Sequence, residues 1–493
     1  MSKLFLKTLL LIMFLFLMNG VLVYGDDSVL GAFLERRPDF LLIANKQSDE
    51  GDIEETKLGM EEDEDVEDLF NGDDFDETIG RDIQVTEKEN RSFEDARFSL
   101  NHQLGYRFQA PEKIVCHRTS LRMEWNSDIS ENLRFQFDGK GVLHYADDHL
   151  TRVQAHSQEY FGDFTMRKFY LQGSFGKWAF KVGRQVVIWG ESDSSVLDDV
   201  SPQDLREIYF TSLEDSRIAQ NLVRITYFRP QSEWDLFVNP DPQTNKYPQA
   251  ETEYHFPFPE DDPDYQIQEN SNVNTEIGLR FKKYYESIDY AFFLASLKEN
   301  QPSYFVVSGT GNDKIELEKK YPPYFLIGMA GNIIFPNTMV KAELAYKFNQ
   351  TYAAKTLTEP VYQKNTVKTA WDFEYLIHHN AKLVIGLKHQ HILEWEENLN
   401  ESKNNTDFFL GGNHLFFYQT LELDYFLNHN QKNQDSVHRL KLFYLIRDDL
   451  KLVISTVYFD PSDSSSGHLA YYGNKSRLSA GIIYYFWLSP FSF

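Results

Sequence analysis

The chain has a single cysteine, Cys116, so the sequence excludes an internal disulfide. Beyond residue 25 it also lacks any apolar run long enough for a membrane-spanning helix. Positive charge is scarce: 49 Lys and Arg stand against 75 Asp and Glu, which gives a net charge of −26. That sign of charge disfavours nucleic acid as a partner.

Motifs of enzymes and metal sites are also missing. No G-x-S-x-G occurs and Ser and His are scattered, so we predict no catalytic residue and no enzymatic activity. His389 and His391 share one face of a predicted strand, but the sequence places no third metal ligand beside them. The acidic residues near position 195 do not have the spacing of an EF-hand loop. We therefore predict neither a metal site nor a cofactor.

The first 95 residues divide into two segments. Residues 1–25 have the positive start, apolar core and small-residue cleavage site of a signal peptide. Residues 26–95 hold 25 acidic and 7 basic residues, too polar a composition to form a packed core, and are predicted to be a mostly disordered periplasmic arm. This arm either docks a periplasmic partner or is solvated filler.

The rest of the chain, residues 96–493, repeats one sequence pattern. Segments of about ten residues alternate apolar and polar side chains, as where Trp371 and Phe373 alternate with Asp372 and Glu374. In a strand such a pattern makes one face apolar and the other charged. Repeated behind a signal peptide, it predicts an all-β protein: a transmembrane antiparallel up-and-down β-barrel surrounded by lipid in the outer membrane of a Gram-negative bacterium.

The strand count is predicted to be 18, with 16 as the alternative. Seventeen alternating segments are recognisable, and the alternation slips between residues 392 and 436. A short strand at 405–410, turned by Gly411, Gly412 and Asn413, would give the even number that such barrels need. The last strand leads to a terminal aromatic residue, which resembles the signal recognised by the outer-membrane assembly machinery.

The phase of the alternation predicts which charged side chains face the lumen. Basic residues outnumber acidic ones about two to one there, which favours either a channel for anionic or polar solutes or a wall braced by ion pairs. The lumen-facing candidates are Arg122, Arg134, Lys181, Arg224, Arg280, Lys341, Asp372, Glu374, Glu422, Asp424, Arg439 and Lys441.

Loop 190–218 departs from the repeat. Its glycine-rich start and a short helix capped by Ser201 before Pro202 indicate a segment that folds back into the barrel and narrows the pore. Arg184 and Arg206 are predicted to pin it by pairing with Asp204, Glu207 or Asp215. The candidates for this constriction are Arg184, Gln185, Trp189, Glu191, Asp193, Asp199, Asp204, Arg206, Glu207, Asp215 and Arg217.

Two motifs here carry a resemblance. The pattern G-R-Q-x-x-x-W-G-E-S-D at 183–193 and D-V-x-P-x-D-L-R-E at 199–207 resemble those of a large, poorly characterised family of bacterial outer-membrane barrels related to the alginate-export porins. The resemblance implies an outer-membrane channel of about eighteen strands with a pore-constricting loop. We therefore expect a porin-like channel for passive or loosely selective passage of small polar or anionic solutes. The alternative is the barrel of an envelope export system that docks a periplasmic partner through its acidic arm.

Overall fold

The structure is a computed structural model that describes residues 96–150, 160–192, 194–197, 200–269, 274–308, 314–356, 361–462 and 467–487. All of them belong to the unit formed by residues 71–493. The predicted signal peptide and acidic arm lie outside the described residues.

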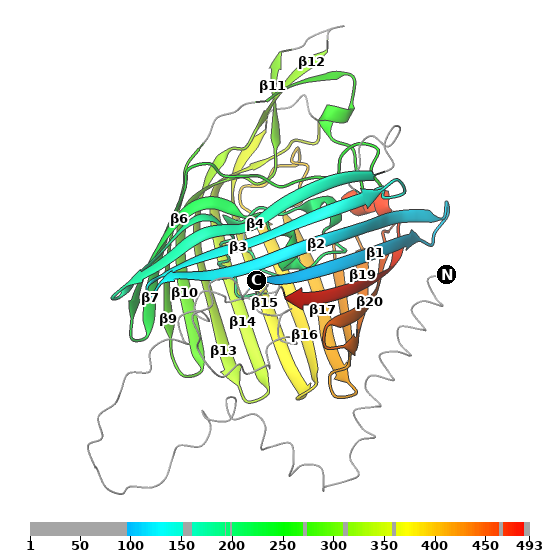
Figure 1. Cartoon of the computed structure of the whole chain (residues 1–493). Coiled ribbons are helices and arrows are strands. Elements are labelled where there is room, and N and C mark those ends of the chain that lie inside the picture. The colour runs from blue at the N-terminus through cyan, green and yellow to red at the C-terminus, as the bar shows by residue number, and fades with distance from the viewer. Residues whose placement is uncertain are drawn as a thin grey trace, which may run out of the picture. The chain divides into compact units, whose positions relative to one another are not determined.

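Eighteen strands form one antiparallel sheet that closes on itself (Figure 1). In ring order they are β1 (Arg97–Arg107), β2 (Lys113–Ser130), β3 (Leu133–Tyr145), β4 (Tyr160–Phe175), β5 (Trp178–Gln185), β6 (Gln220–Arg229), β7 (Ser232–Asn239), β9 (Glu276–Tyr284), β10 (Ile288–Lys298), β13 (Pro323–Phe335), β14 (Thr338–Tyr352), β15 (Tyr362–His378), β16 (Ala381–Ile392), β17 (Asn404–Phe416), β18 (Leu421–Asn430), β19 (Asp435–Arg447), β20 (Leu450–Asp460) and β21 (Arg477–Trp487). The ring closes where β21 pairs with β1 over the whole length of both strands. The predicted 18-stranded barrel is confirmed, and the 16-stranded alternative is wrong.

The two faces of the sheet follow the alternation in the sequence. On β15, Trp371 and Phe373 are 52% and 44% exposed on the outside, whereas Asp372 and Glu374 are 2% and 4% exposed on the inside. Many of the other strands repeat this division, and exposed Leu, Ile, Val and aromatic side chains lie on their outer face, whereas all residues of β18 are of intermediate exposure. An apolar outer face and a polar inner face are the arrangement of a barrel immersed in lipid.

The connections alternate in length. Turns of two to four residues join strands at one end, at 131–132, 176–177, 230–231, 285–287, 336–337, 379–380, 417–420 and 448–449. Longer connections gather at the other end. Two of them contribute a separate three-stranded sheet of β8 (Tyr265–Glu269), β11 (Ser303–Ser308) and β12 (Ile315–Lys320), which the sequence analysis missed. The connections also hold the short helices η2 (Leu205–Glu207), α4 (Leu213–Ser216), η3 (Pro259–Asp261) and η4 (His468–Tyr472). None of the helices in the described residues is long and apolar enough to cross a membrane.

The predicted turn at Gly411 and Gly412 is wrong, although the strand count is right. Both glycines lie inside β17, paired with β16 and β18. A Cβ at Gly412 would lie 2.7 Å from the carbonyl oxygen of Lys382, so the glycine permits close backbone approach within the sheet. The turn lies instead at 417–420, where three consecutive non-glycine residues, from Phe417 to Gln419, adopt positive φ.

The register between β1 and β21 can be tested by cross-linking. Leu104 and Ala480 lie opposite each other on the outer face. Opposite residues of antiparallel strands have Cα atoms about 4.5–5.5 Å apart, within the range of a disulfide. We expect the double substitution Leu104→Cys, Ala480→Cys to form one on oxidation, seen as a loss of about 2 Da and faster migration of the unreduced chain. The pair Leu104→Cys, Tyr484→Cys, four residues out of register, should not cross-link, and efficient cross-linking of this control would contradict the closed ring.

Candidate functional site: a loop across the barrel lumen

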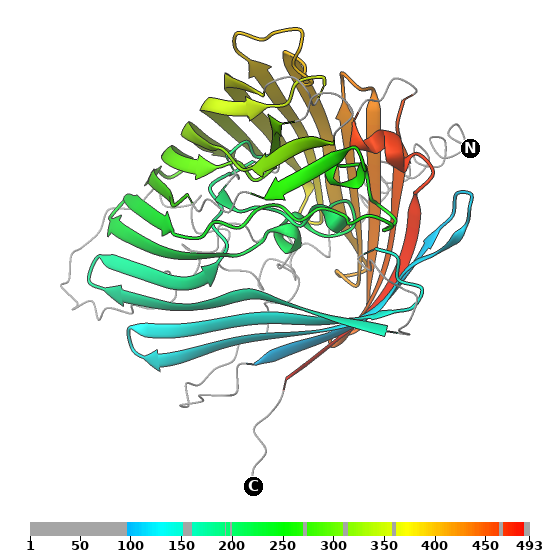
Figure 2. The same ribbon diagram turned by 90° about the horizontal axis from the view of Figure 1, so that it is seen from above.

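The connection between β5 and β6 lies inside the ring of strands (Figure 2). Its first part is apolar and packs against the inner face of β6 to β15. Trp189 is 1% exposed, and its ring centroid lies 5.1 Å from that of Phe237 on β7 and 5.2 Å from that of Phe293 on β10. Val196 and Leu197 belong to the same buried cluster. Burying side chains of this size stabilises the docked loop by about 1.5–3 kcal/mol each.

Small residues on the inner wall make room for this packing. A Cβ at Gly278 on β9 would lie 2.3 Å from the Trp189 ring, and one at Gly328 on β13 would lie 2.4 Å from a methyl carbon of Leu197. Alanines continue the same surface on the strands that follow, at Ala291, Ala295, Ala330, Ala345 and Ala370. This part of the lumen is therefore shaped to receive the loop.

A carboxylate on β14 binds the loop backbone. Glu343, 2% exposed, accepts hydrogen bonds from the backbone nitrogens of Glu191 (2.6 Å), Ser192 (2.8 Å) and Val196 (2.8 Å). The hydroxyl of Ser195 donates to the same carboxylate at 2.8 Å. Hydrogen bonds to an ionised acceptor are stronger than neutral ones, so this carboxylate fixes the path of the chain.

Neighbouring strands extend this anchor. Asp372 on β15 accepts from the hydroxyls of Ser192 (2.5 Å) and Ser194 (3.1 Å). The carboxylate of Glu191 pairs with Lys282 on β9 at 2.8 Å and accepts from the side-chain amide of Asn332 on β13 at 3.0 Å. The first half of the loop is thus bonded to the wall from β9 to β15.

The second half of the loop is bonded to basic residues of other strands. Both carboxylate oxygens of Glu207 accept from the guanidinium of Arg118 on β2. Asp215 in α4 pairs with Arg167 on β4 at 2.6 Å. The carbonyl oxygen of Thr211 accepts from Arg439 on β19 at 3.3 Å. In these three contacts the loop supplies the acceptors and the wall supplies the donors, whereas in the first half Glu343 and Asp372 of the wall also act as acceptors.

These two anchors lie on opposite walls. β2 is the second and β14 the eleventh strand of the 18-stranded ring, half a circumference apart. A chain bonded to Glu343 at one point and to Arg118 at another must therefore cross the lumen.

Electrostatics stabilises the second anchor. Burial raises the pKa of Glu207, but the opposing effect of Arg118, with smaller contributions from Arg477 and Arg206, is larger and lowers it to about 2. Asp215 is affected in the same direction, because Arg167, Lys140 and Arg122 outweigh its desolvation and lower its pKa.

The structure distributes the predicted loop residues among several environments. Arg206 pairs with Asp204 two residues away in the same loop, and among the described residues Arg184 does not join an acid of the loop. It shares the outward face of Val182 and donates to the carbonyl oxygen of Met166 at 2.7 Å, because β5 is still a strand at this position. The remaining members are either buried or outside the described residues: Gln185 and Trp189 are 1% exposed and Arg217 is 8% exposed, and Asp193 and Asp199 are not described.

The predicted lumen residues mostly form cross-strand ion pairs. Cross-strand contacts join Arg122 to Asp138 (2.8 Å), Arg224 to Asp235 (2.7 Å), Arg280 to Glu233 (2.5 Å), Lys341 to Glu374 (2.6 Å) and Arg134 to Asp128 (2.7 Å). Lys181 lies over the ring of Tyr170, and Asp424, two residues beyond Glu422, lies opposite Lys441 in register. The predicted basic excess omitted Glu233 and Asp235, two buried acids of β7.

Two arginines of the site were not predicted. Arg167 lies at a bulge, because Asp138 pairs with Lys168 and Gly139 with Met166, which leaves Arg167 as the extra residue of β4. A strict alternation assigns Lys168 to the lumen and misses this shift. Gly139 in a strand is the signal that could have indicated the bulge. Arg118 was missed although its phase matches that of Arg122.

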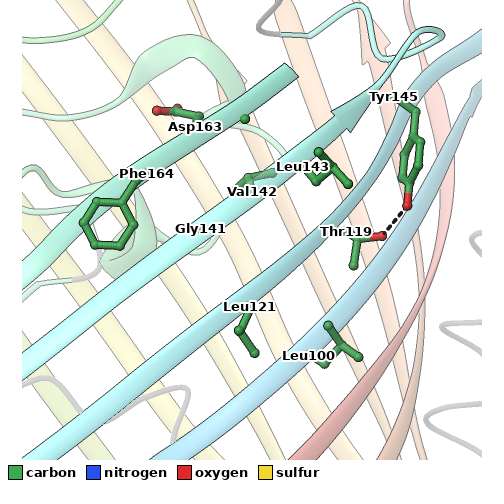
Figure 3. A pocket seen from close by; sticks show the side chains of 10 residues that line it. Leu100, Thr119, Leu121, Gly141, Val142, Leu143, Tyr145, Asp163 and Phe164 are labelled. Carbon is green, nitrogen blue, oxygen red and sulfur yellow. Dashed lines mark hydrogen bonds between the residues drawn. The ribbon is translucent and has the colours of Figure 1, made fainter. Parts of the chain in front are cut away.

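A groove of about 480 Å³ lies on the opposite, outer face of β1 to β4 (Figure 3). Its walls are mainly Leu100, Leu121, Leu143 and Phe164, all exposed side chains of the apolar outer surface. Near one end the hydroxyl groups of Thr119 and Tyr145 lie 3.2 Å apart. The groove is separated from the loop by the barrel wall and is not part of the candidate site.

Comparison with known proteins gives one family. Residues 118–411, more than half of the chain, match the family described as "Protein of unknown function (DUF1302)". No curated protein matches the sequence.

Several solved structures are similar at low sequence identity. OccK8 (OprE) of Pseudomonas aeruginosa has 8% identity and a TM-score of 0.48, with 80% of this chain and 99% of that chain covered. OccAB3 of Acinetobacter baumannii has 10% identity and a TM-score of 0.47, with 80% and 99% covered. A BenF-like porin from Pseudomonas fluorescens Pf-5 has 11% identity and a TM-score of 0.47, with 81% and 100% covered.

The Glu343 anchor predicts how the loop responds to a substitution. In Glu343→Gln the acceptor loses its charge, and each hydrogen bond to a charged group contributes about 1.5–3 kcal/mol. We expect the amides of 191–196 to exchange with deuterium about tenfold faster or more, measured by mass spectrometry. Glu286→Gln, in an exposed turn, is the matched control. Equal exchange in the two variants would show that Glu343 does not hold the loop.

The Arg118–Glu207 anchor predicts an acid transition. The pKa of Glu207 in the docked loop is about 2, below the value of about 4.3 for a free Glu. The ionised carboxylate therefore contributes its full stabilisation of the docked loop above about pH 5, and this contribution is lost as the pH falls towards 2. We expect pepsin to leave residues 205–212 intact at pH 4 and to cleave there at pH 2. Glu207→Gln should be cleaved at both values. A wild-type protein cleaved equally at pH 4 and pH 2 would contradict this anchor.

Proposed function

We propose, from the geometry of its lumen, that the chain, which belongs to the DUF1302 family of unknown function, is an outer-membrane channel for small polar or anionic solutes. The observation that carries this proposal is a chain segment that crosses a closed, charged barrel interior between Glu343 and Arg118.

The outer surface supports a membrane location. A ring without free edges satisfies its backbone hydrogen bonds internally, which is the condition for strands to lie in hydrocarbon. Large apolar side chains such as Phe292, Leu294 and Met329 project outward from the middle of the strands. Exposing such a continuous apolar band to water is unfavourable, so the band is expected to contact the acyl chains of lipids.

The interior supports passage of polar solutes past a constriction. Charged side chains on the inner wall can replace part of the hydration shell of a solute in a narrow pore. Most of these charged side chains are already in ion pairs, so the wall itself has little net charge with which to discriminate between solutes. Selectivity between solutes therefore depends on the loop. Glu207 and Asp215 neutralise the basic wall of β2 to β4 while they stay docked there.

The loop also supports a narrow pore. Apolar side chains of its first half pack against β6 to β15, and its second half is bonded to the opposite wall at Arg118. Nothing in this arrangement calls for a catalytic group, and we propose a non-enzymatic role. The export alternative rests on the acidic arm, which lies outside the described residues.

Conductance tests the proposal directly. We expect the purified protein in planar bilayers to show discrete single-channel currents, and deletion of 191–217 to raise the conductance several-fold because the segment no longer crosses the pore. Deletion of 303–320, which removes β11 and β12 from the separate sheet, is the control and should leave the conductance within about a factor of two. Absence of any current in the wild-type protein would contradict the channel, and an unchanged conductance in the first deletion would place the loop outside the permeation path.

A further inference from the structure

Arg477 is a buried cation whose guanidinium has no hydrogen-bond acceptor. It is the first residue of β21, points into the lumen and is 1% exposed. None of its three guanidinium nitrogens bonds to an acceptor among the described residues. The carbon of the guanidinium instead lies 3.5 Å from the ring centroid of Phe210, which follows η2 in the loop. Burying a charged group against an aromatic ring without a hydrogen-bond acceptor costs free energy, because the ring replaces only part of the group's hydration.

The surroundings of Arg477 carry an excess of positive charge. Arg107 lies directly opposite it on β1 and pairs with Glu253 at 2.5 Å, and Lys113 shares that carboxylate at 2.8 Å. On β2, Arg118 holds Glu207. Glu253 thus holds Arg107 and Lys113, and Glu207 holds Arg118, but neither carboxylate is hydrogen-bonded to Arg477 in the described structure.

The wall beside Arg477 is shaped around its side chain. A Cβ at Gly105 would lie 3.0 Å from the Cδ of Arg477 and 3.2 Å from the hydroxyl oxygen of Ser479, so only glycine leaves room for both groups there. Ser479 is 3% exposed, and its hydroxyl also has no hydrogen-bond partner in the described part of the chain. Gly105 is therefore close to both side chains, and neither the Arg477 guanidinium nor the Ser479 hydroxyl is hydrogen-bonded to a described residue.

We propose that Arg477 is the binding group for an oxyanion, a carboxylate or phosphate of the permeating solute, which displaces the ring of Phe210. The assignment rests on the proposed channel function and names the solute class. A guanidinium presents its donors as a planar fork that fits the two oxygens of such an anion. The neighbouring Arg118 shows the same recognition within this chain, since its fork holds both oxygens of Glu207.

Displacing Phe210 is compatible with the rest of the loop. Its ring packs on Tyr254 at 4.8 Å and on Phe459 at 6.2 Å, in a cluster formed by the longer connections at the mouth of the barrel. The anchor at Glu343 lies on the opposite wall and does not involve Phe210. An oxyanion therefore opens one side of the loop and leaves the other side bound.

Binding and conductance together test this site. We expect benzoate and inorganic phosphate to raise the thermal unfolding midpoint of the wild-type barrel in detergent and to reduce its single-channel current. In Arg477→Gln the apparent affinity for both probes should fall about ten- to a hundredfold, the effect of losing hydrogen bonds to a charged group. Arg447→Gln, at an exposed arginine beside Asp449, is the matched control and should bind as the wild type does. Equal affinity in Arg477→Gln and wild type would overturn the assignment.

A second variant keeps the test decisive if Arg477→Gln does not assemble. Phe210→Ala removes the ring that the anion must displace, so its affinity for both probes should rise several-fold. Phe417→Ala, at an exposed turn residue, is its control. Unchanged or weaker binding in Phe210→Ala would overturn the assignment. A wild-type protein that binds the probes but passes no current would contradict the channel function but not the binding site. A channel whose current is unchanged by both probes and by Arg477→Gln would contradict the binding site alone.

Discussion

Closure of the sheet between β1 and β21 is the constraint on which the rest of the structure depends. A closed ring leaves no unpaired strand edge, and it divides the alternating side chains into an outer and an inner set. The outer set can then be uniformly apolar. The inner set has to satisfy its charges within a limited space, and it does so with cross-strand pairs such as Arg224 with Asp235 and Lys341 with Glu374.

The loop between β5 and β6 uses this limited space in two different ways. Beside β9 to β15 the wall carries glycine and alanine, so the loop can pack there as a small hydrophobic core with Trp189 at its centre. Beside β2 to β4 the wall carries arginines, which form ion pairs with carboxylates of the loop. The same segment is therefore held by packing, backbone amides and the Glu191–Lys282 ion pair on one side, and mainly by arginine–carboxylate pairs on the other.

The sequence predicts the barrel well because a two-residue period is a local signal. The alternation around Asp372 and Glu374 identifies both the strand and its inner face, and the strand count followed from a phase slip. Features that break the period were harder to predict. The bulge at Arg167 shifts the phase by one residue, and the glycines at 411 and 412 serve close packing of strands rather than a turn. The partners of the loop were not predictable, because Glu343 and Arg118 are brought to it only by the closure of the ring. The small residues at 278, 328, 330, 345 and 370 were the sequence signal for its docking surface.

Under the proposed oxyanion binding, the two anchors of the loop respond differently to an anionic solute. Glu343 and Asp372, whose carboxylate oxygens already bind the loop, repel an anionic solute. Such a solute also cannot replace the apolar packing around Trp189. At Arg118 and Arg477 the same solute carries the charge and the oxygens that these guanidinium groups prefer. Competition is therefore confined to the segment after residue 200. Under the proposed binding of an oxyanion, the lumen favours anions because Arg477 becomes available to the solute when the ring of Phe210 moves aside.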